Sequence, residues 1–386
     1  MNRSRKIRLF PNKEQRRVFD RWFGCVRKTY NWTLECIRMD DEIPKTNYIE
    51  LRKHFVNAEA IPDSMKYLLE CPKHIRDGAL QDLTAAYKSN FTKRAKDPSH
   101  IWEMKFRSRK DSQSIRIPKI SQTIDADDKV WGCFAAYLKG TVPFKARKRD
   151  AERNKTVRSI DHDCRLLKDR LGRYYLCVPM NSPVRDNQTD GWVALDPGVR
   201  TFLTAYSPAF GTAYKIGDGD INRICRLCLH LDGLYSRRAK AVHAKRYKLK
   251  RAIVRLTLRI RHLVDDVHWK AIDFLTDNFS NIVVPPFEVS GMVKKGQRKI
   301  NKKCVRSMIT WRHFGFRQRL LSVASAKGVN VHVMGEEYTT KTCTLCFRMN
   351  DRVGGAKVFR CPHCNVRVDR DLAGARNIFL KNVLSA

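Results

Sequence analysis

Four cysteines near the C-terminus constrain the fold of this chain more than any other feature. They form two C-x2-C pairs with 14 residues between them: Cys343 and Cys346, then Cys361 and Cys364. Each pair forms a tight turn whose two thiolates reach one ion, and two such pairs complete the tetrahedron that Zn²⁺ prefers. We therefore predict a zinc ribbon holding one structural Zn²⁺, because four thiolates leave no coordination position open.

The other nine of the 13 cysteines are scattered and are most simply explained as core packing. The total is odd, and MNRSRKIRLFPNKEQ lacks the apolar stretch of a secretory signal, so we expect a reducing compartment without a disulfide framework. Cys225 and Cys228 form another C-x2-C pair inside a predicted helix, with no second pair nearby, and we assign them to packing. No apolar run approaches ~18 residues, so no membrane span is expected.

A strong positive charge points to a polyanionic partner. The chain has 386 residues, and 77 Lys and Arg against 39 Asp and Glu give a formal net charge of +38. Such an excess opposes compaction unless a polyanion neutralises it, and nucleic acid is the obvious candidate. Two stretches, 237–261 and 289–335, each contain 11 Lys and Arg and no acid, which indicates surfaces for a phosphate backbone.

The first 190 residues predict a β-rich domain with a helical insertion. A short strand precedes a helix that begins at Asn12, which has the side chain of a helix cap. Residues 62–95 are predicted to be helical, and 101–110 (IWEMKFRSRK) alternate between apolar and charged side chains, which is typical of a strand. The segment 181–191 is rich in turn formers and predicts a linker.

The rest of the chain predicts a five-stranded sheet. WVALDPG (192–198) is a continuous apolar run typical of a strand buried on both faces, and two more strands follow it. Helices are expected over 219–276, and strands again at NIVVPPF (281–287) and VNVHVMGEEY (329–338). A short helix from Asp371 ends the chain. Three strands, helices, two strands and a final helix are the layout of an RNase H-like nuclease.

Two acids lie at the ends of these elements. Asp196 stands where a buried strand breaks, so its charge needs compensation, for example by a metal; a turn-forming Asp before Pro197 is the alternative. Asp371 opens the last helix, where a role as helix cap or as an acid that complements the helix dipole would alone explain it. In an RNase H-like domain such carboxylates hold two divalent cations that activate water and stabilise the leaving 3′ oxygen of a phosphodiester, and Mg²⁺ suits all-oxygen ligation.

The chain resembles the TnpB family of transposon-encoded RNA-guided nucleases over nearly its whole length. The segments similar to its RuvC nuclease half are DPGVRTFLTAYS, YTTKTC with the two cysteine pairs, and DRDLAGARNI; those similar to its N-terminal half are RLFPNKEQRRVFDRWFGCVRKTYNWTLE and MKFRSRKDSQSIRIP. The type V CRISPR effectors are larger relatives. The resemblance implies four parts: a β-rich wedge with a helical recognition region (1–190), RuvC (191–342), an inserted zinc ribbon (343–364) and a final RuvC segment (365–386).

The resemblance also implies which acids are catalytic. Most bacterial members have a Glu at the end of the fourth strand, but Pro285 stands at the matching position here. Fanzor, the eukaryotic and viral branch, instead takes this acid from the next strand, which here offers Glu336, our choice, or Glu337, the alternative. The implied ligands of two Mg²⁺ are Asp196, Glu336 and Asp371. Asp369 is expected to support them, and Arg370 and Arg376 are candidates for phosphate contacts.

The activity implied is RNA-guided cleavage of double-stranded DNA next to a short flanking motif. The partners are then an omega-type guide RNA and the target DNA, bound by a monomeric ribonucleoprotein that a transposable element encodes. Two alternatives remain: a catalytically weak or inactive RNA-guided DNA-binding regulator, because the Glu is displaced, and a guide-independent transposase or junction nuclease. KKGQRKINKK (294–303) resembles a nuclear localisation signal, so we expect the nucleus in a eukaryotic or viral setting, and otherwise the cytoplasm or nucleoid.

Overall fold

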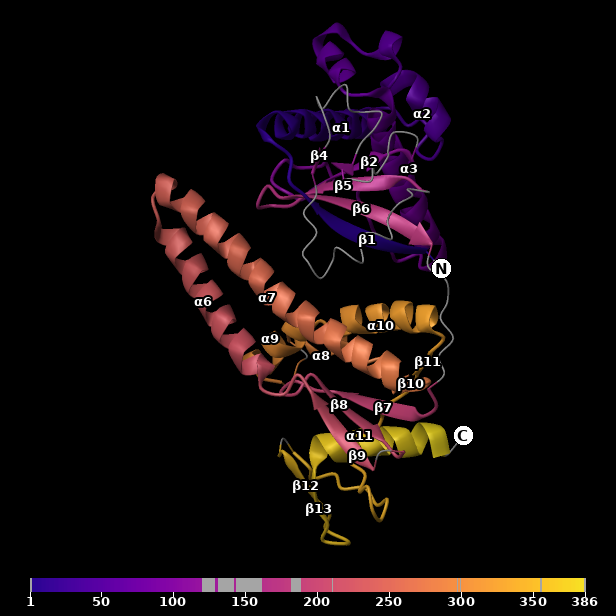
Figure 1. The fold of residues 1–386 in the computed structure, drawn as a ribbon, viewed down its shortest axis with the longest axis vertical. Coiled ribbons are helices and arrows are strands. Elements are labelled where there is room, and N and C mark those ends of the chain that lie inside the picture. The colour runs from indigo at the N-terminus through magenta and orange to yellow at the C-terminus, as the bar shows by residue number, and fades with distance from the viewer. Residues whose placement is uncertain are drawn as a thin grey trace. The chain divides into compact units, whose positions relative to one another are not determined.

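The computed structural model describes residues 2–119, 129–130, 142–143, 162–181, 189–209, 211–296, 298, 300–354 and 356–384. The chain divides into two compact units, Asn2–Ser182 and Pro183–Ala386 with Met1, and Figure 1 traces both. No helix among the described residues is long and apolar enough to cross a membrane. Both units mix helices with strands, which confirms the predicted α/β multidomain class.

The N-terminal unit is built on a four-stranded antiparallel sheet in the order β1-β6-β5-β2. β1 and β6 pair along their whole lengths, so that Ile7 lies opposite Leu176, and both side chains are buried. The strands are β1 (Asn2–Leu9), β2 (Gln113–Ile117), β5 (Cys164–Lys168) and β6 (Tyr174–Asn181). Two short strands, β3 (Lys129–Val130) and β4 (Val142–Pro143), pair with each other.

Helices share one hydrophobic core with this sheet. They are α1 (Lys13–Met39), α2 (Tyr48–Phe55), α3 (Lys73–Lys96) and the 3-10 helices η1 (Ala58–Ala60) and η2 (Asp63–Glu70). α1 begins at the predicted cap, because Asn12 Oδ1 accepts a hydrogen bond from Gln15 N (2.9 Å) and Gln15 Oε1 accepts one from Asn12 N (3.0 Å). Its long apolar face, which includes Phe19 and Trp22, is buried in the core.

Two predictions for the N-terminal unit are wrong in detail. The helix expected over 62–95 is split into η2 and α3 at Pro72, whose ring nitrogen has no hydrogen to continue the helical bonding. The strand expected over 101–110 does not form a ladder with any strand in the described part of the chain. Instead the Asn31 side chain binds the backbone of Arg107, at 2.8 Å to its N and 3.0 Å to its O, and so takes the place of a neighbouring strand. The predicted linker lies largely outside the described residues.

The C-terminal unit contains the predicted five-stranded sheet, in the order β11-β10-β7-β8-β9. β7 is central: β8 and β9 continue it as antiparallel strands, and β10 and β11 are parallel to it on the other side. The strands are β7 (Trp192–Pro197), β8 (Leu203–Ser207), β9 (Thr212–Ile216), β10 (Asn281–Val284) and β11 (Asn330–Val333).

Helices cover both faces of this sheet (Figure 1). On one face lie α6 (Asp220–Lys240), α7 (His243–Asn278), α9 (Lys302–Trp311) and α10 (His313–Lys327), with the short α8 (Val289–Met292); on the other lies α11 (Arg370–Phe379), followed by the π-helical turn η4 (Leu380–Leu384). Val193 and Leu195 belong to the core under α7 and α10, whereas Ala194 packs with Ile378 of α11. Since side chains alternate along a strand, Asp196 shares the α11 face with Ala194.

The segment between β11 and α11 holds the four predicted zinc ligands. It contains a small antiparallel pair, β12 (Val358–Arg360) and β13 (Arg367–Asp369), and its own core around the buried Phe359. β13 leads directly into α11, so the position of the ribbon and that of Asp371 are tied together.

Candidate functional site

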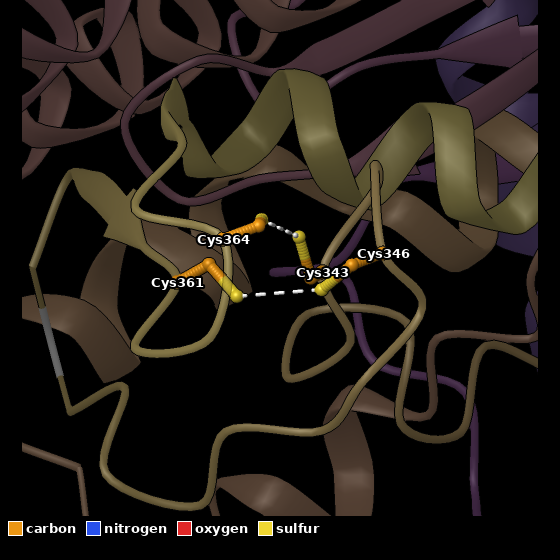
Figure 2. Close-up of side chains that lie close together, drawn as sticks. All are labelled: Cys343, Cys346, Cys361 and Cys364. Carbon is orange, nitrogen blue, oxygen red and sulfur yellow. Dashed lines mark hydrogen bonds between the residues drawn. The ribbon is translucent and has the colours of Figure 1, made fainter.

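The four cysteines converge as the sequence predicts (Figure 2). The sulfur atoms of Cys343 and Cys364 are 3.6 Å apart and those of Cys346 and Cys361 are 3.5 Å apart, and all four lie within 4.8 Å of one another. A tetrahedral Zn²⁺ with Zn–S bonds of about 2.3 Å needs its sulfurs about 3.8 Å apart. The number, type and spacing of the donors therefore fit one structural Zn²⁺.

Both C-x2-C pairs fold in the same way. The residue after each pair, Phe347 or Asn365, has φ near +57°, and its N–H donates to the carbonyl of the first cysteine at 3.1 Å. A backbone N–H two residues beyond the first cysteine points at its sulfur, from Leu345 to Cys343 and from His363 to Cys361, both at 3.4 Å. These donors stabilise thiolate ligands, since N–H groups favour negative charge on sulfur.

The hydrogen bonds around Cys361 also favour its thiolate form. Desolvation opposes ionisation of the thiol, but backbone N–H groups of Cys364 and His363 outweigh it and lower the pKa of Cys361 to about 6. The His363 ring does not join the cluster and lies 3.5 Å from the Arg348 guanidinium.

Asp196 is held at the end of β7 against α11. The contact is close at Gly374, where a Cβ would lie 2.7 Å from Asp196 Oδ2, so only glycine fits there without a shift. The pKa of Asp196 is raised well above its usual value by burial, then by the negative charges of Asp371 and Glu336; Arg370 partly offsets them. The negative charges of two acids from distant segments therefore act on Asp196, which accepts no hydrogen bond from a described residue.

The helix-capping explanation for Asp371 does not hold, because its neighbour performs that role. The Asp369 carboxylate accepts a hydrogen bond from Asp371 N at 3.0 Å and lies 2.6 Å from Lys215 Nζ. Burial disfavours the charged form of Asp369, but these contacts outweigh it and lower the pKa of the carboxyl. Asp369 thus caps α11 and pairs with β9, whereas the half-buried Asp371 lies in the first turn of α11, where its charge also complements the helix dipole.

The two glutamates after β11 differ in their surroundings. Glu336 is half-buried, and burial, followed by the negative charge of Glu337, raises the pKa of its carboxyl. Glu337 is exposed and lies 2.8 Å from Lys381 Nζ, whose hydrogen bond lowers the pKa of Glu337. Of the two glutamates, Glu336 is the one whose negative charge contributes to the raised pKa of Asp196. At the end of β10, Pro285 and Pro286 offer no carboxylate, and the Pro286 carbonyl accepts a hydrogen bond from Arg317.

Two family models match the chain: "Cas12f1-like, TNB domain" over residues 313–378, and "Helix-turn-helix domain" over residues 1–38. The chain is 28% identical to "Putative transposase A625R" of Paramecium bursaria Chlorella virus 1, over 98% of this chain and 86% of that protein. It is 25% identical to "TnpB-like protein L79" of Acanthamoeba polyphaga mimivirus, over 97% of this chain and 72% of that protein. It is 24% identical to "Putative RNA-guided DNA endonuclease InsQ" of Escherichia coli (strain K12), over 97% of this chain and 90% of that protein.

The chain is similar to TnpB-like proteins over nearly its whole length. Its fold is Cas12-like, since the solved complex of Cas12f1 with sgRNA and target DNA covers 98% of each chain with a TM-score of 0.55 at 14% identity. The TNB match spans α10, β11, the ribbon and most of α11. The residues matched by the helix-turn-helix model form β1 and α1.

The last helix also holds the loop that carries Glu336. Asn377 is buried and donates to the carbonyls of Thr339 and Thr342, both at 2.8 Å. Thr339 Oγ1 in turn donates to the Glu336 carbonyl at 2.8 Å. Arg376, a candidate for a phosphate contact, donates to the Thr344 carbonyl at 2.7 Å. The sequence analysis missed Asn377 and Gly374, although both follow Asp371 within two helical turns.

Proposed function

We propose that this chain is an RNA-guided endonuclease that hydrolyses double-stranded DNA, with Asp196, Glu336 and Asp371 as ligands of two Mg²⁺. The observation that carries the proposal is the burial of Asp196 at the end of β7, against α11, where the negative charges of Asp371 and Glu336 act on it. Such burial beside like charges costs stability unless cations offset it, and perturbed carboxylates that have a specific charged neighbour are typical of functional sites.

The sheet supports the assignment to an RNase H-like RuvC domain. Numbered along the chain, its five strands lie in the order 3-2-1-4-5, with the first three antiparallel and the last two parallel to the first. The order along the chain, three strands, helices, two strands and a final helix, is the layout on which the sequence hypothesis rests. The N-terminal unit, with its sheet and helices α1 to α3, then corresponds to the wedge and recognition parts.

The donor set fits Mg²⁺, because all three side chains offer carboxylate oxygens and Asp196 has no hydrogen-bond partner among the described residues. Among the described residues the four cysteines are the only group of three or more whose ligand atoms all lie within 4.8 Å of one another, so the three acids are spaced more widely. Two ions about 3.5–4 Å apart would allow such a spacing. When bound, the ions would supply a nucleophilic water and stabilise the leaving oxygen. The chain's own part is to hold the oxygens in place: Asp196 through Gly374, Asp371 through the Asp369 cap, and Glu336 through Thr339.

The partners proposed are an omega-type guide RNA and a target DNA with a short flanking motif, bound by a monomeric ribonucleoprotein. The name of InsQ supports this class of partner, and so does the sgRNA and target DNA bound in the solved Cas12f1 complex. The net charge of +38 supports it too, and so does the hairpin of α6 and α7, whose acid-free stretch 237–261 supplies cations for a phosphate backbone. A transposable element would encode such a protein.

Within the family, we place the chain with Fanzor. The support is the position of the acid: Pro285 follows β10, whereas Glu336 follows β11. A nuclear location goes with this placement and with the basic segment 294–303, parts of which lie outside the described residues.

The test is to purify the full chain and sequence any RNA that copurifies. DNA matching the guide part of that RNA is then offered with Mg²⁺, and Asp196→Ala is the control. We expect a defined RNA and cleavage by the unchanged chain only. Bound RNA and DNA without cleavage would favour the inactive regulator, and cleavage by RNA-free protein would favour a guide-independent nuclease.

A further inference from the structure

The N-terminal unit contains a cavity of about 330 Å³ that the nuclease chemistry does not use. It lies between α1, β2, β5 and the segment that leads into β2, and we call it the arginine pocket. Among the side chains that line it are Phe23, Arg27, Phe106, Arg107, Gln113 and Arg165. Its volume is at the lower end of the range for small-molecule sites, which suits one nucleotide rather than a longer strand.

The pocket has more positive than negative charge. Arg107 and Arg165 share a single acid, Asp82, at 2.8 and 2.5 Å, and the Asp82 side chain is only 10% exposed. Burial disfavours the charged form of Asp82, but the hydrogen bonds from both arginines outweigh it and lower the pKa of the carboxyl. The other acid of the lining, Asp111, is paired with Arg170 at 3.0 Å. Two acids therefore face several guanidinium groups, and both are already engaged.

Arg27 is the guanidinium without an acid. It is half-buried, its Nη1 donates to Gln113 Oε1 at 3.0 Å, and no carboxylate of a described residue forms an ion pair with it. Burial, and then the positive charge of Arg109, lower the pKa of Arg27. An anion in the pocket would relieve both effects, and phosphate matches the forked geometry of a guanidinium.

The aromatic ring of Phe106 lines the same pocket as Arg27. Phe106 is 47% exposed although it lines the pocket, and the Arg38 guanidinium lies 4.6 Å from its ring. A half-exposed ring next to a phosphate site is the arrangement on which a nucleic-acid base stacks. The Gln113 Oε1 atom accepts from Arg27 at 3.0 Å, and its Nε2 donates to the carbonyls of Ser108 and Asp111, both at 2.8 Å.

We propose that the arginine pocket binds one unpaired nucleotide of the RNA that this chain carries, with a phosphate on Arg27 and the base against Phe106. RNA is favoured over duplex DNA because single-stranded RNA bases are splayed out and stacked on aromatic and arginine side chains, whereas duplex bases are already paired and stacked. The proposal rests on the proposed function, since it takes a bound RNA as given.

The test measures binding of a fluorescein-labelled, mixed-sequence, single-stranded RNA of ten nucleotides to the full chain over a range of KCl concentrations. Arg27→Gln should lower the slope of log affinity against log salt by about 0.7, the value for one phosphate contact on a single strand. Phe106→Ala should weaken binding about tenfold, as the loss of one stacked base does.

The matched control is Arg21→Gln. Arg21 lies on the same helix but outside the pocket and is paired with Glu70 at 2.6 Å, so we expect its slope and affinity to stay near those of the unchanged chain. Thermal unfolding of each variant separates a folding defect from a binding defect. If Arg27→Gln unfolds, Phe106→Ala still tests the proposal, because the Phe106 side chain is half-exposed.

Crosslinking identifies the ligand. The chain is purified with its nucleic acid, irradiated with ultraviolet light and digested, and the peptide with Phe106 is recovered. An adduct removed by ribonuclease supports the proposal, and one removed only by deoxyribonuclease overturns it. If Arg27→Gln and Phe106→Ala bind RNA like the Arg21→Gln control, this proposal alone fails. If the unchanged chain binds no RNA, the proposed function fails as well.

Discussion

Replacing Gly374 with alanine tests whether the close contact between α11 and Asp196 serves the chemistry. The new Cβ would lie 2.7 Å from Asp196 Oδ2 and 3.3 Å from its Cγ. Ordinary contact begins at 3.4 Å, so the carboxylate and the helix must separate by about 0.7 Å. A misplacement near 1 Å costs about 100-fold in a positioned reaction, and we expect a loss of this order in the cleavage rate.

The effect on stability should be much smaller. Alanine is favoured over glycine in a helix by about 1 kcal/mol, while the crowding costs about 1–3 kcal/mol. The two partly cancel, so the free energy of unfolding should fall by no more than about 2 kcal/mol. The expected signature is therefore a nearly normal melting temperature with a strongly reduced rate.

Gly233 provides a matched control. It lies inside α6, and a Cβ there meets nothing within 4 Å. Gly233→Ala should raise the free energy of unfolding by about 1 kcal/mol and leave cleavage unchanged. The assay is single-turnover cleavage of matched DNA by the RNA-loaded protein with Mg²⁺, together with thermal unfolding of both variants. Full cleavage by Gly374→Ala would refute the argument that this contact positions a catalytic carboxylate.

Three other predictions concern the glutamates, the ribbon and pH. Glu336→Gln should abolish cleavage and leave DNA binding intact, whereas Glu337→Gln should keep cleavage; the reverse result would move the site by one residue. Cys361→Ser should lower the zinc content measured by atomic absorption and reduce cleavage, because the ribbon leads directly into α11; full zinc and full activity would contradict this. Burial lowers the pKa of His268 to about 4 and that of His313 to about 3, so these side chains bind more protons in the unfolded chain between these values and about 6.5, and they destabilise the fold as pH drops through this window. The raised pKa values of Asp196 and Glu336 act in the opposite direction. The melting temperature should therefore fall more steeply from pH 7 to 4 in the unchanged chain than in His313→Asn, and equal slopes would disprove this.

Local patterns in the sequence predicted local geometry well. The C-x2-C spacing predicted four sulfurs within reach of one ion, and Asn12 predicted the start of α1, because both depend on residues close along the chain. The apolar run of β7 predicted a buried strand with Asp196 at its end. These inferences need only the period of a strand, the cap of a helix or the reach of a turn.

Tertiary contacts explain the predictions that were wrong or missing. The segment 101–110 has the alternation of a strand, but the Asn31 side chain takes its backbone hydrogen bonds. The hydrogen bond from Arg376 to the Thr344 carbonyl was not predicted. Asn377 joins segments 35 and 38 residues away, and only the folded chain places these partners together. No local pattern distinguishes Glu336 from Glu337 on physical grounds, whereas the Lys381 ion pair does.

The most direct test of the central claim is an anomalous difference map from crystals of the protein bound to its RNA and DNA and soaked in Mn²⁺. We expect two peaks, about 3.5–4 Å apart, each in contact with carboxylates from the set Asp196, Glu336 and Asp371. A map with no peak among these side chains, at a concentration of Mn²⁺ that supports cleavage in solution, would contradict the account.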